Sequence, residues 1–147
     1  MENLMTMMKT SISEVFETMF FLPVEFNENL SGEQIEAIKK EISIGCKLNA
    51  IGSFSACFQL FIPNSLLLNM TENFMGETPE NCTKEYLDGT LKEALNMIIG
   101  NALKKIDTKT PPQLDIPKII TISEIGSDSL IITETTNGTI IMNIELN

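Results

Sequence analysis

Glu93 and Asn96, an acid and an amide, stand three residues apart in a long predicted helix. At about 100° per residue, both fall opposite the apolar side of that helix, within roughly 60° of Gly89 and Gly100. The spacing sets the two side chains next to each other, so one docked surface could meet both. Each helix-interior glycine costs about 1 kcal/mol relative to alanine. Two on one exposed face therefore suggest that another molecule approaches the backbone closely.

A simpler interpretation of the same four residues stays open from spacing alone. The face could be an ordinary solvated one, with Gly89 near a frayed turn and Gly100 as a packing compromise. Short motifs are weak evidence without structural context. The spacing therefore indicates that this helix face is a candidate binding or catalytic site, and it leaves the function of the face open.

Several kinds of catalysis are excluded by residue types that the chain lacks. It contains no His, Arg or Trp, which rules out Ser-His-Asp and Cys-His catalysis, Cys-x5-Arg phosphatase chemistry and most zinc sites within this chain. Its cysteines, Cys46, Cys57 and Cys82, are odd in number and show no CxxC spacing, so packed or surface thiols are expected. Any catalysis must use Asp, Glu, Asn, Lys, Ser or Thr, or groups supplied by a partner.

The charge balance restricts the class of partner. Ten basic residues against twenty acidic ones give a formal charge of −10, which argues against nucleic acid and anionic membrane as ligands, because both need Lys or Arg to displace counterions. A protein that offers Lys or Arg is favoured instead. No run reaches the roughly 18 apolar residues of a membrane span, and the first residues lack the pattern of a signal peptide. We therefore expect a cytoplasmic protein.

The helix that carries Glu93 and Asn96 has recognisable ends. A start signal lies at Thr78-Pro79-Glu80, and the helix is predicted to run to about Ile106. Lys104 and Lys105 near its C-terminal end are placed favourably against the helix dipole. Its apolar residues share one broad sector that must face the core: Leu87, Leu91, Ala94, Leu95, Ile98, Ala102 and Ile106.

Two other helices precede it. Apolar residues recur at three- and four-residue steps from about Glu2 to Phe20, which predicts an amphipathic helix that Pro23 ends or redirects. A shorter helix through Leu66 and Phe74 is predicted to stop at Gly76.

The remaining segments are predicted to be strands and loops. A short segment at residues 24–26 precedes a polar loop, Asn27–Gln34. Alternating or apolar runs predict five strands: Ile42–Leu48, Phe54–Ile62, Ile116–Ile125, Leu130–Thr135 and Thr139–Leu146. The first two should pair antiparallel around Ile51-Gly52, and the last two around a type I′ turn at Asn137-Gly138. The whole, residues 1–147, reads as one α+β domain of two α-β(2-3) units, with a central mixed or antiparallel sheet under two long helices.

The run Leu91-Lys92-Glu93-Ala94-Leu95-Asn96-Met97-Ile98-Ile99-Gly100-Asn101-Ala102 resembles the signature helix of the CheX/CheC/FliY family of chemotaxis phosphatases. Its marks are Glu-x-x-Asn followed by Met-Ile-x-Gly-Asn-Ala. The helix around Glu14–Met19 and the order of elements are also similar, so the likeness spans nearly the whole chain. It implies a CheC-like fold. Because Glu17 is followed three residues later by Phe20 and not by an amide, a single site is expected, as in the CheX-like branch.

The resemblance implies hydrolysis of the phosphoaspartate of a CheY-like response regulator. Asn96 would orient the attacking water, Glu93 would pair with the regulator's Lys, and Gly89 and Gly100 would contact the partner. Mg²⁺ would be held in the regulator's site and no cofactor by this chain. A homodimer is a further expectation, since an open sheet needs its edges covered.

The sequence departs from the family pattern at two places. Gly89 stands where the family has Asp or Ser, and the neighbouring Asp88 lies at the edge of the buried face, so it is no substitute. Pro117 follows a loop that is slightly short. The missing acid leaves an alternative open: a noncatalytic dimeric adaptor that binds a response regulator or another chemotaxis component. A small-molecule hydrolase would need a pocket of convergent polar groups, which the sequence does not indicate.

Overall fold

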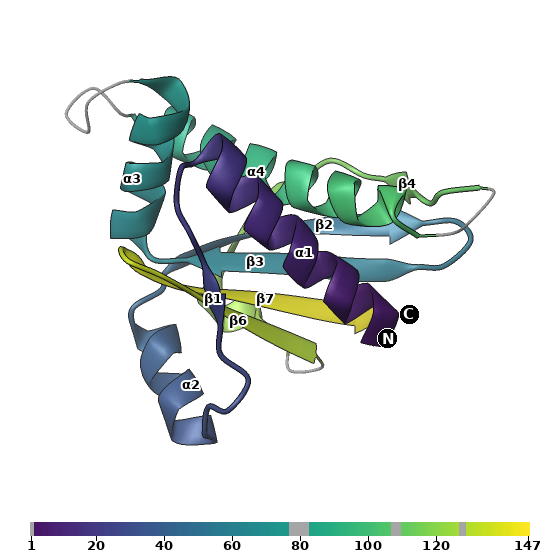
Figure 1. Ribbon diagram of the computed structural model, residues 1–147, viewed down its shortest axis with the longest axis horizontal. Helices are drawn as coiled ribbons and strands as arrows, with labels where there is room; N and C mark the ends of the chain where they lie inside the picture. Colours follow the sequence, from purple (N-terminus) through teal and green to yellow (C-terminus); the bar gives the residue numbers. More distant parts are fainter. Residues whose placement is uncertain (1, 77–82, 107–109, 127–128) are drawn as a thin grey trace.

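One antiparallel sheet organises the chain. The computed structural model describes residues 2–76, 83–106, 110–126 and 129–147 (Figure 1). The strands follow the order β1-β6-β7-β3-β2-β4, with β5 also paired to β2. Their bounds are β1 Glu25–Phe26, β2 Ile44–Ile51, β3 Ala56–Ile62, β4 Gln113–Leu114, β5 Lys118–Thr121, β6 Ser129–Thr135 and β7 Gly138–Leu146. Every described pairing is antiparallel, which settles the sheet type that the sequence left open.

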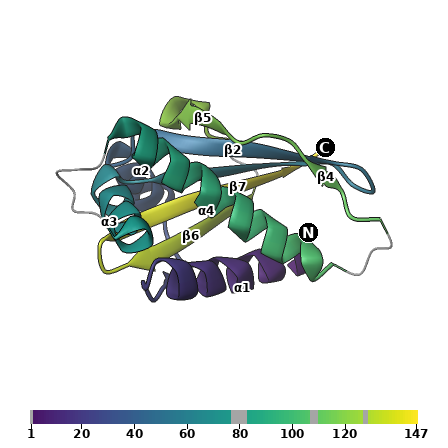
Figure 2. The same cartoon turned by 90° about the horizontal axis from the view of Figure 1, so that it is seen from above.

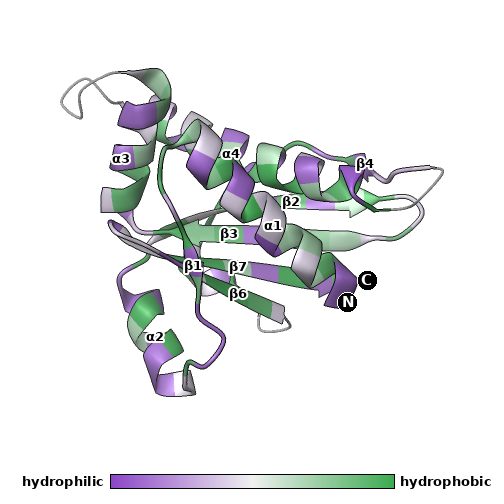
Figure 3. Cartoon of the chain, in the orientation of Figure 1, coloured by the Kyte–Doolittle hydropathy of each residue, from purple (hydrophilic) through white to green (hydrophobic). Residues whose placement is uncertain are grey.

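Three helices cover one face of this sheet. They are α1 (Glu2–Met19), α3 (Asn64–Met75) and α4 (Lys84–Lys104), and the view from above shows α1 and α4 side by side over the strands (Figure 2). The hydroxyl of Ser11 donates a buried hydrogen bond of 2.6 Å to the carbonyl of Ile98, which ties α1 to α4. Apolar residues concentrate on the strands and on one side of each of these helices (Figure 3). This core fixes α4 along its length.

The opposite face of the sheet carries a smaller apolar cluster. Its buried members are Ile42, Phe61, Ile120, Ile132 and Ile141. Partly buried residues from α2 (Gly32–Lys40) and from a short 3₁₀ helix (Ile122–Glu124) pack against them. The two apolar layers explain why the central strands β3 and β7 are buried along most of their length.

The helix boundaries follow ordinary capping chemistry. Ser31 forms a capping box with Gln34, in which the Ser31 side chain accepts from the Gln34 amide and the Gln34 side chain accepts from the Ser31 amide. Thr83 accepts a hydrogen bond from the Tyr86 amide at the start of α4. Gly76, with φ of 70°, ends α3 as predicted.

Several sequence predictions need correction. The polar stretch Asn27–Gln34 is not wholly loop, because α2 begins at Gly32. The strand predicted over Ile116–Ile125 is shorter: β5 covers Lys118–Thr121, and the 3₁₀ helix follows. The β6–β7 hairpin exists, but Thr135 pairs with Gly138, so its turn centres on Thr136-Asn137. Asn137 does not have positive φ, which excludes the predicted type I′ turn.

The predicted start of the long helix at Thr78-Pro79-Glu80 lies outside the described residues. The helix that the structure describes, α4, begins at Lys84. Within the described ranges, no helix is long and apolar enough to cross a membrane.

Candidate functional site

The exposed face of α4 presents the predicted acid and amide together. Glu93 and Asn96 are both exposed, whereas Leu91, Ala94 and Leu95 on the other side of the helix are fully buried. The predicted apolar sector is confirmed, with Leu87 and Ile106 only partly buried and Thr90, Ile99 and Leu103 added to the buried set. Because one side of α4 is packed into the core, the polar pair is held at a fixed position on the surface.

The polar atoms of both side chains are available to another molecule. Within the part of the chain that the structure describes, neither the Glu93 carboxylate nor the Asn96 carboxamide makes a side-chain hydrogen bond or an ion pair. An exposed carboxylate can therefore meet a cation of another molecule. The neighbouring carboxamide can both donate and accept hydrogen bonds without changing charge.

A shallow depression surrounds this pair. It has a volume of about 370 Å³ and is lined by Glu93, Asn96, Met97, Gly100, Asn101, Lys104 and Leu114. Leu114 comes from β4, which lies beside the C-terminal half of α4 (Figure 2). The depression is open to solvent and has no enclosed cavity for a small substrate. Its shape suits a protein surface laid against α4.

The two glycines of this face have no packing reason to be glycine. A Cβ added at Gly89 or at Gly100 would meet nothing within 4 Å. The interpretation of Gly100 as a packing compromise is therefore wrong, and Gly89 lies inside α4 and not at its described end. Gly100 lines the depression and Gly89 does not. Open space above both residues leaves the helix backbone accessible from outside.

Asp88 does not replace the acid that the pattern lacks at Gly89. Its side chain is 20% exposed, and one carboxylate oxygen accepts a hydrogen bond of 3.2 Å from the Lys84 ammonium. The other oxygen is buried and has no partner among the described residues. Asp88 thus turns toward the protein, as its helical angle predicted.

A second site on α1 is not formed. Glu17 is exposed, but Phe20, three residues later, is fully buried and packs its ring against those of Phe16 and Phe74, with centroid distances of 5.5 and 5.8 Å. The residue three positions after Glu17 therefore offers no amide, and the Glu17 carboxylate accepts a hydrogen bond of 3.3 Å from the Ser13 hydroxyl instead. The single-site expectation rests on this difference.

Metal binding and thiol chemistry find little support. Among the described residues, no group of three or more Cys, Asp or Glu side chains could hold a metal ion. Burial raises the pKa of the Cys46 thiol to about 12, and burial together with the Glu145 charge raises the pKa of Cys57. Both described cysteines are therefore protonated near neutral pH and are poor nucleophiles.

Comparison with known protein families assigns the chain to a family. The sequence profile of the family described as "Chemotaxis phosphatase CheX" matches residues 44–140, a span that includes Glu93 and Asn96 and exceeds half of the chain. The chain belongs to the CheX family. No curated protein sequence matches the chain.

Solved structures confirm the CheC-like fold of this CheX-family chain. The CheX protein of Vibrio vulnificus superposes with a TM-score of 0.80 at 16% identity, over 98% of this chain and 96% of that one. A CheC-like superfamily protein from Shewanella sp. PV-4 gives 0.75 at 18% identity, over 99% and 97%. A chain of the CheX-CheY-BeF3-Mg complex from Borrelia burgdorferi gives 0.73 at 15% identity, over 97% of each chain.

Sequence reasoning missed part of the surface around the polar pair in this CheX-family chain. Lys104 was explained by the helix dipole alone, and Leu114 was not assigned to an element, yet both line the depression with Glu93 and Asn96. A signal for Lys104 existed, because residue 104 follows residue 93 by eleven positions, close to three full helical turns. None existed for Leu114, since its place depends on how the chain returns from α4 to the edge of β2.

Proposed function

We propose that this CheX-family chain promotes hydrolysis of the phosphoaspartate on a CheY-like response regulator. The observation that carries the proposal is the pair Glu93 and Asn96, exposed side by side on a helix whose other face is buried and without intramolecular partners in the described chain. A chain without His or Arg can act this way because the regulator supplies the reacting group, and this protein supplies geometry.

Asn96 would enter the regulator's site and orient the attacking water. Its carboxamide oxygen would accept a hydrogen bond from the water and its amide group would donate one, which aligns the water with the phosphorus. The water oxygen forms a bond to phosphorus as the bond to the aspartyl oxygen breaks. The products are inorganic phosphate, which takes the water's oxygen and both of its protons, and the free aspartate carboxylate, which keeps the electron pair of the broken bond.

Glu93 would anchor the complex by pairing with the regulator's phosphate-binding Lys. A carboxylate and an ammonium in a closed interface form a charge-assisted hydrogen bond, stronger than a neutral one. The open space above Gly89 and Gly100 supports a close approach of the partner to the helix backbone. The Borrelia burgdorferi relative, whose complex contains CheY, BeF3 and Mg²⁺, supports a partner of this class, and we propose that the regulator of this chain holds Mg²⁺.

The experiment is the rate of phosphate loss from a phosphorylated CheY-like regulator of the same genome, in Mg²⁺, with wild type, Asn96→Ala or Asn29→Ala. Asn29 is exposed in the segment before α2 and serves as the matched control. We expect wild type and Asn29→Ala to accelerate decay equally, and Asn96→Ala to lose about 100-fold of the rate, since misplacing a reactant by about 1 Å has that effect. Binding of the regulator without any acceleration of decay would support the adaptor alternative. The replacement of the family's Asp or Ser by Gly89 would then be the first explanation to test.

We also propose that the chain forms a homodimer. β1 pairs only with Thr133 and Glu134 of β6 among the described residues, so this edge of the sheet is incompletely covered. Sedimentation equilibrium over a range of concentrations tests the proposal, and a monomer at all concentrations would contradict it.

A further inference from the structure

The depression on α4 has opposite charges at its two ends. Glu93 and Lys104 both line it, and the residues between them, Asn96, Met97, Gly100 and Asn101, are uncharged. Eleven residues of helix separate the two charges by about 16 Å along the axis, and their directions differ by only about 20°. At that separation, beyond a Debye length of about 8 Å at physiological salt, the two charges do not neutralise each other.

Lys104 differs from its neighbour Lys105 in having no ion-pair partner among the described residues. Four other lysines form ion pairs in the described chain, among them its neighbour Lys105, whose ammonium lies 3.0 Å from the Glu14 carboxylate. Lys104 is exposed and makes no ion pair with a described residue. The Lys104 ammonium is therefore available to a partner and lies on the same side of α4 as Glu93, on the surface of a chain with a formal charge of −10.

We propose that Lys104 is a partner-recognition residue, which pairs with an acidic side chain of the regulator beside its phosphoaspartate site and fixes the direction in which the regulator docks along α4. This inference rests on the proposed function. With the regulator's Lys at Glu93 and its acid at Lys104, both ends of the depression are matched. A reversed docking would oppose like charges at both ends, which is the repulsive element that specificity requires.

The chemistry of the partner favours this arrangement. A phosphoaspartate site that binds Mg²⁺ must itself be built from carboxylates, because oxygen ligands are what Mg²⁺ prefers. The face of the regulator that carries such a site therefore offers carboxylates as well as its phosphate-binding Lys. Met97 and Leu114 add apolar surface to the depression, which the regulator would bury when the two surfaces meet.

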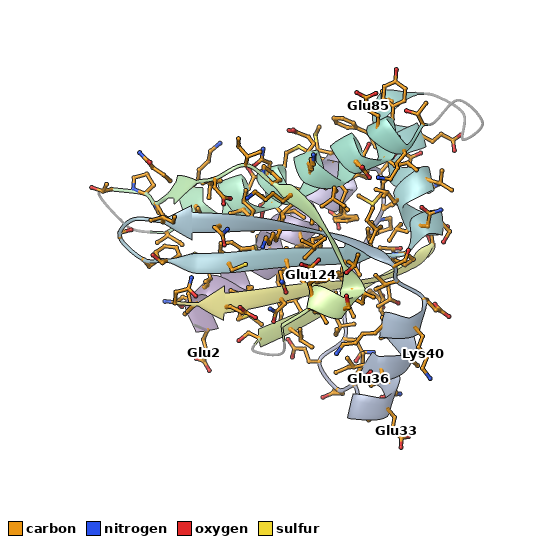
Figure 4. The ribbon with its side chains drawn as sticks, turned by 180° about the vertical axis from the view of Figure 1, so that it is seen from behind. Glu2, Glu33, Glu36, Lys40, Glu85 and Glu124 are labelled. Atoms are coloured by element: carbon orange, nitrogen blue, oxygen red, sulfur yellow. The ribbon has the colours of Figure 1, made fainter. Side chains whose placement is uncertain are left out.

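The helix dipole offers a second reason for a lysine at position 104, and the test must separate the two. Lys104 lies in the last turn of α4 and Lys40 in the last turn of α2. Lys40 is also exposed, makes no ion pair among the described residues and projects from α2, away from the helix layer (Figure 4). Lys40→Glu is therefore a matched control for net charge and for helix-end effects.

The experiment measures affinity for the CheY-like regulator of the same genome, loaded with Mg²⁺ and beryllofluoride, at several salt concentrations, together with kcat and KM for dephosphorylation. For Lys104→Glu we expect KM and Kd to rise about 5- to 10-fold with kcat unchanged, and the salt dependence to flatten, because a charge at the rim of an interface acts on association. Lys104→Arg should restore affinity, and Lys40→Glu should match wild type.

The outcomes separate this inference from the proposed function. If wild type binds without accelerating decay, and Lys104→Glu still weakens binding, the proposed hydrolysis is wrong and the recognition role stands. If wild type accelerates decay and Lys104→Glu leaves Kd, KM and the salt dependence within twofold of the control, the recognition role is wrong and the hydrolysis stands. No binding of the loaded regulator by wild type would overturn the recognition role.

Discussion

Replacing the two glycines of α4 with alanine should make the protein more stable and less active. Gly89→Ala and Gly100→Ala add a methyl group where nothing lies within 4 Å. Both positions are inside a 21-residue helix. No intramolecular contact therefore opposes the intrinsic preference of a helix for alanine.

The magnitude follows from that preference. Glycine is about 0.8–1.0 kcal/mol less favourable than alanine in an exposed helix interior, so the double variant should gain roughly 2 kcal/mol in its free energy of unfolding. For a chain of this size, 1 kcal/mol shifts the melting temperature by about 2–4 °C, so the double variant should melt about 4–8 °C higher. The proposed phosphatase activity should fall nevertheless, because each methyl group would project into the space that the regulator is proposed to approach.

Urea denaturation followed by circular dichroism, with the dephosphorylation assay on the same samples, measures both effects. Gly45→Ala is the contrasting control, because its Cβ would overlap the Phe61 ring and should destabilise the protein by about 1–3 kcal/mol. A double variant that is more stable and fully active would refute the idea that the partner approaches these glycines. A destabilised double variant would show that α4 needs glycine for its own conformation.

Two further predictions concern the interior. Ser11→Ala removes the buried hydrogen bond to the Ile98 carbonyl and should lower the free energy of unfolding by about 1 kcal/mol. Ser13→Ala loses only a 3.3 Å hydrogen bond to Glu17 and should change the free energy of unfolding by less than about 0.5 kcal/mol. Urea denaturation of both variants distinguishes the two effects. Burial raises the pKa of Cys46 to about 12, so its thiol should resist iodoacetamide at pH 8 in the folded protein, because only the thiolate reacts. In urea the same thiol should become reactive. Peptide mass spectrometry measures the labelling, and rapid labelling of the folded protein would contradict the prediction.

The sequence predicts the elements that bury a regular apolar pattern and misses those that do not. α1, α3 and α4 have a continuous apolar face, and β2–β3 and β6–β7 alternate or run apolar beside turn residues, so periodicity alone locates them. α2 has no fully buried residue. Its clearest signal is the capping pair Ser31 and Gln34, which lay inside the stretch interpreted as loop.

The limits of the site prediction have a similar cause. Helical geometry is local, so the alignment of Glu93, Asn96, Gly89 and Gly100 follows from residue numbers. The wall contributed by Leu114 depends on the pairing of β4 with the far end of β2, where Ala50 lies opposite Leu114. Such a contact between distant segments has no counterpart in local spacing, so a single sequence does not reveal it.

A last prediction compares α4 with α1. It tests whether an exposed glutamate on a long helix is sufficient for activity, or whether the neighbouring amide is needed as well. Glu17→Ala and Glu93→Ala remove the same side chain from exposed positions on the two long helices. Three residues after Glu93 stands the exposed Asn96, but three residues after Glu17 the ring of Phe20 is buried against Phe16 and Phe74. Glu93→Ala should therefore raise KM for the phosphorylated regulator about 10-fold or more, since it leaves a partner Lys unpaired in the interface. Glu17→Ala should stay within twofold of wild type, and an equal loss in both variants would mean that the regulator is held by the charge of the surface and not by the acid-amide pair.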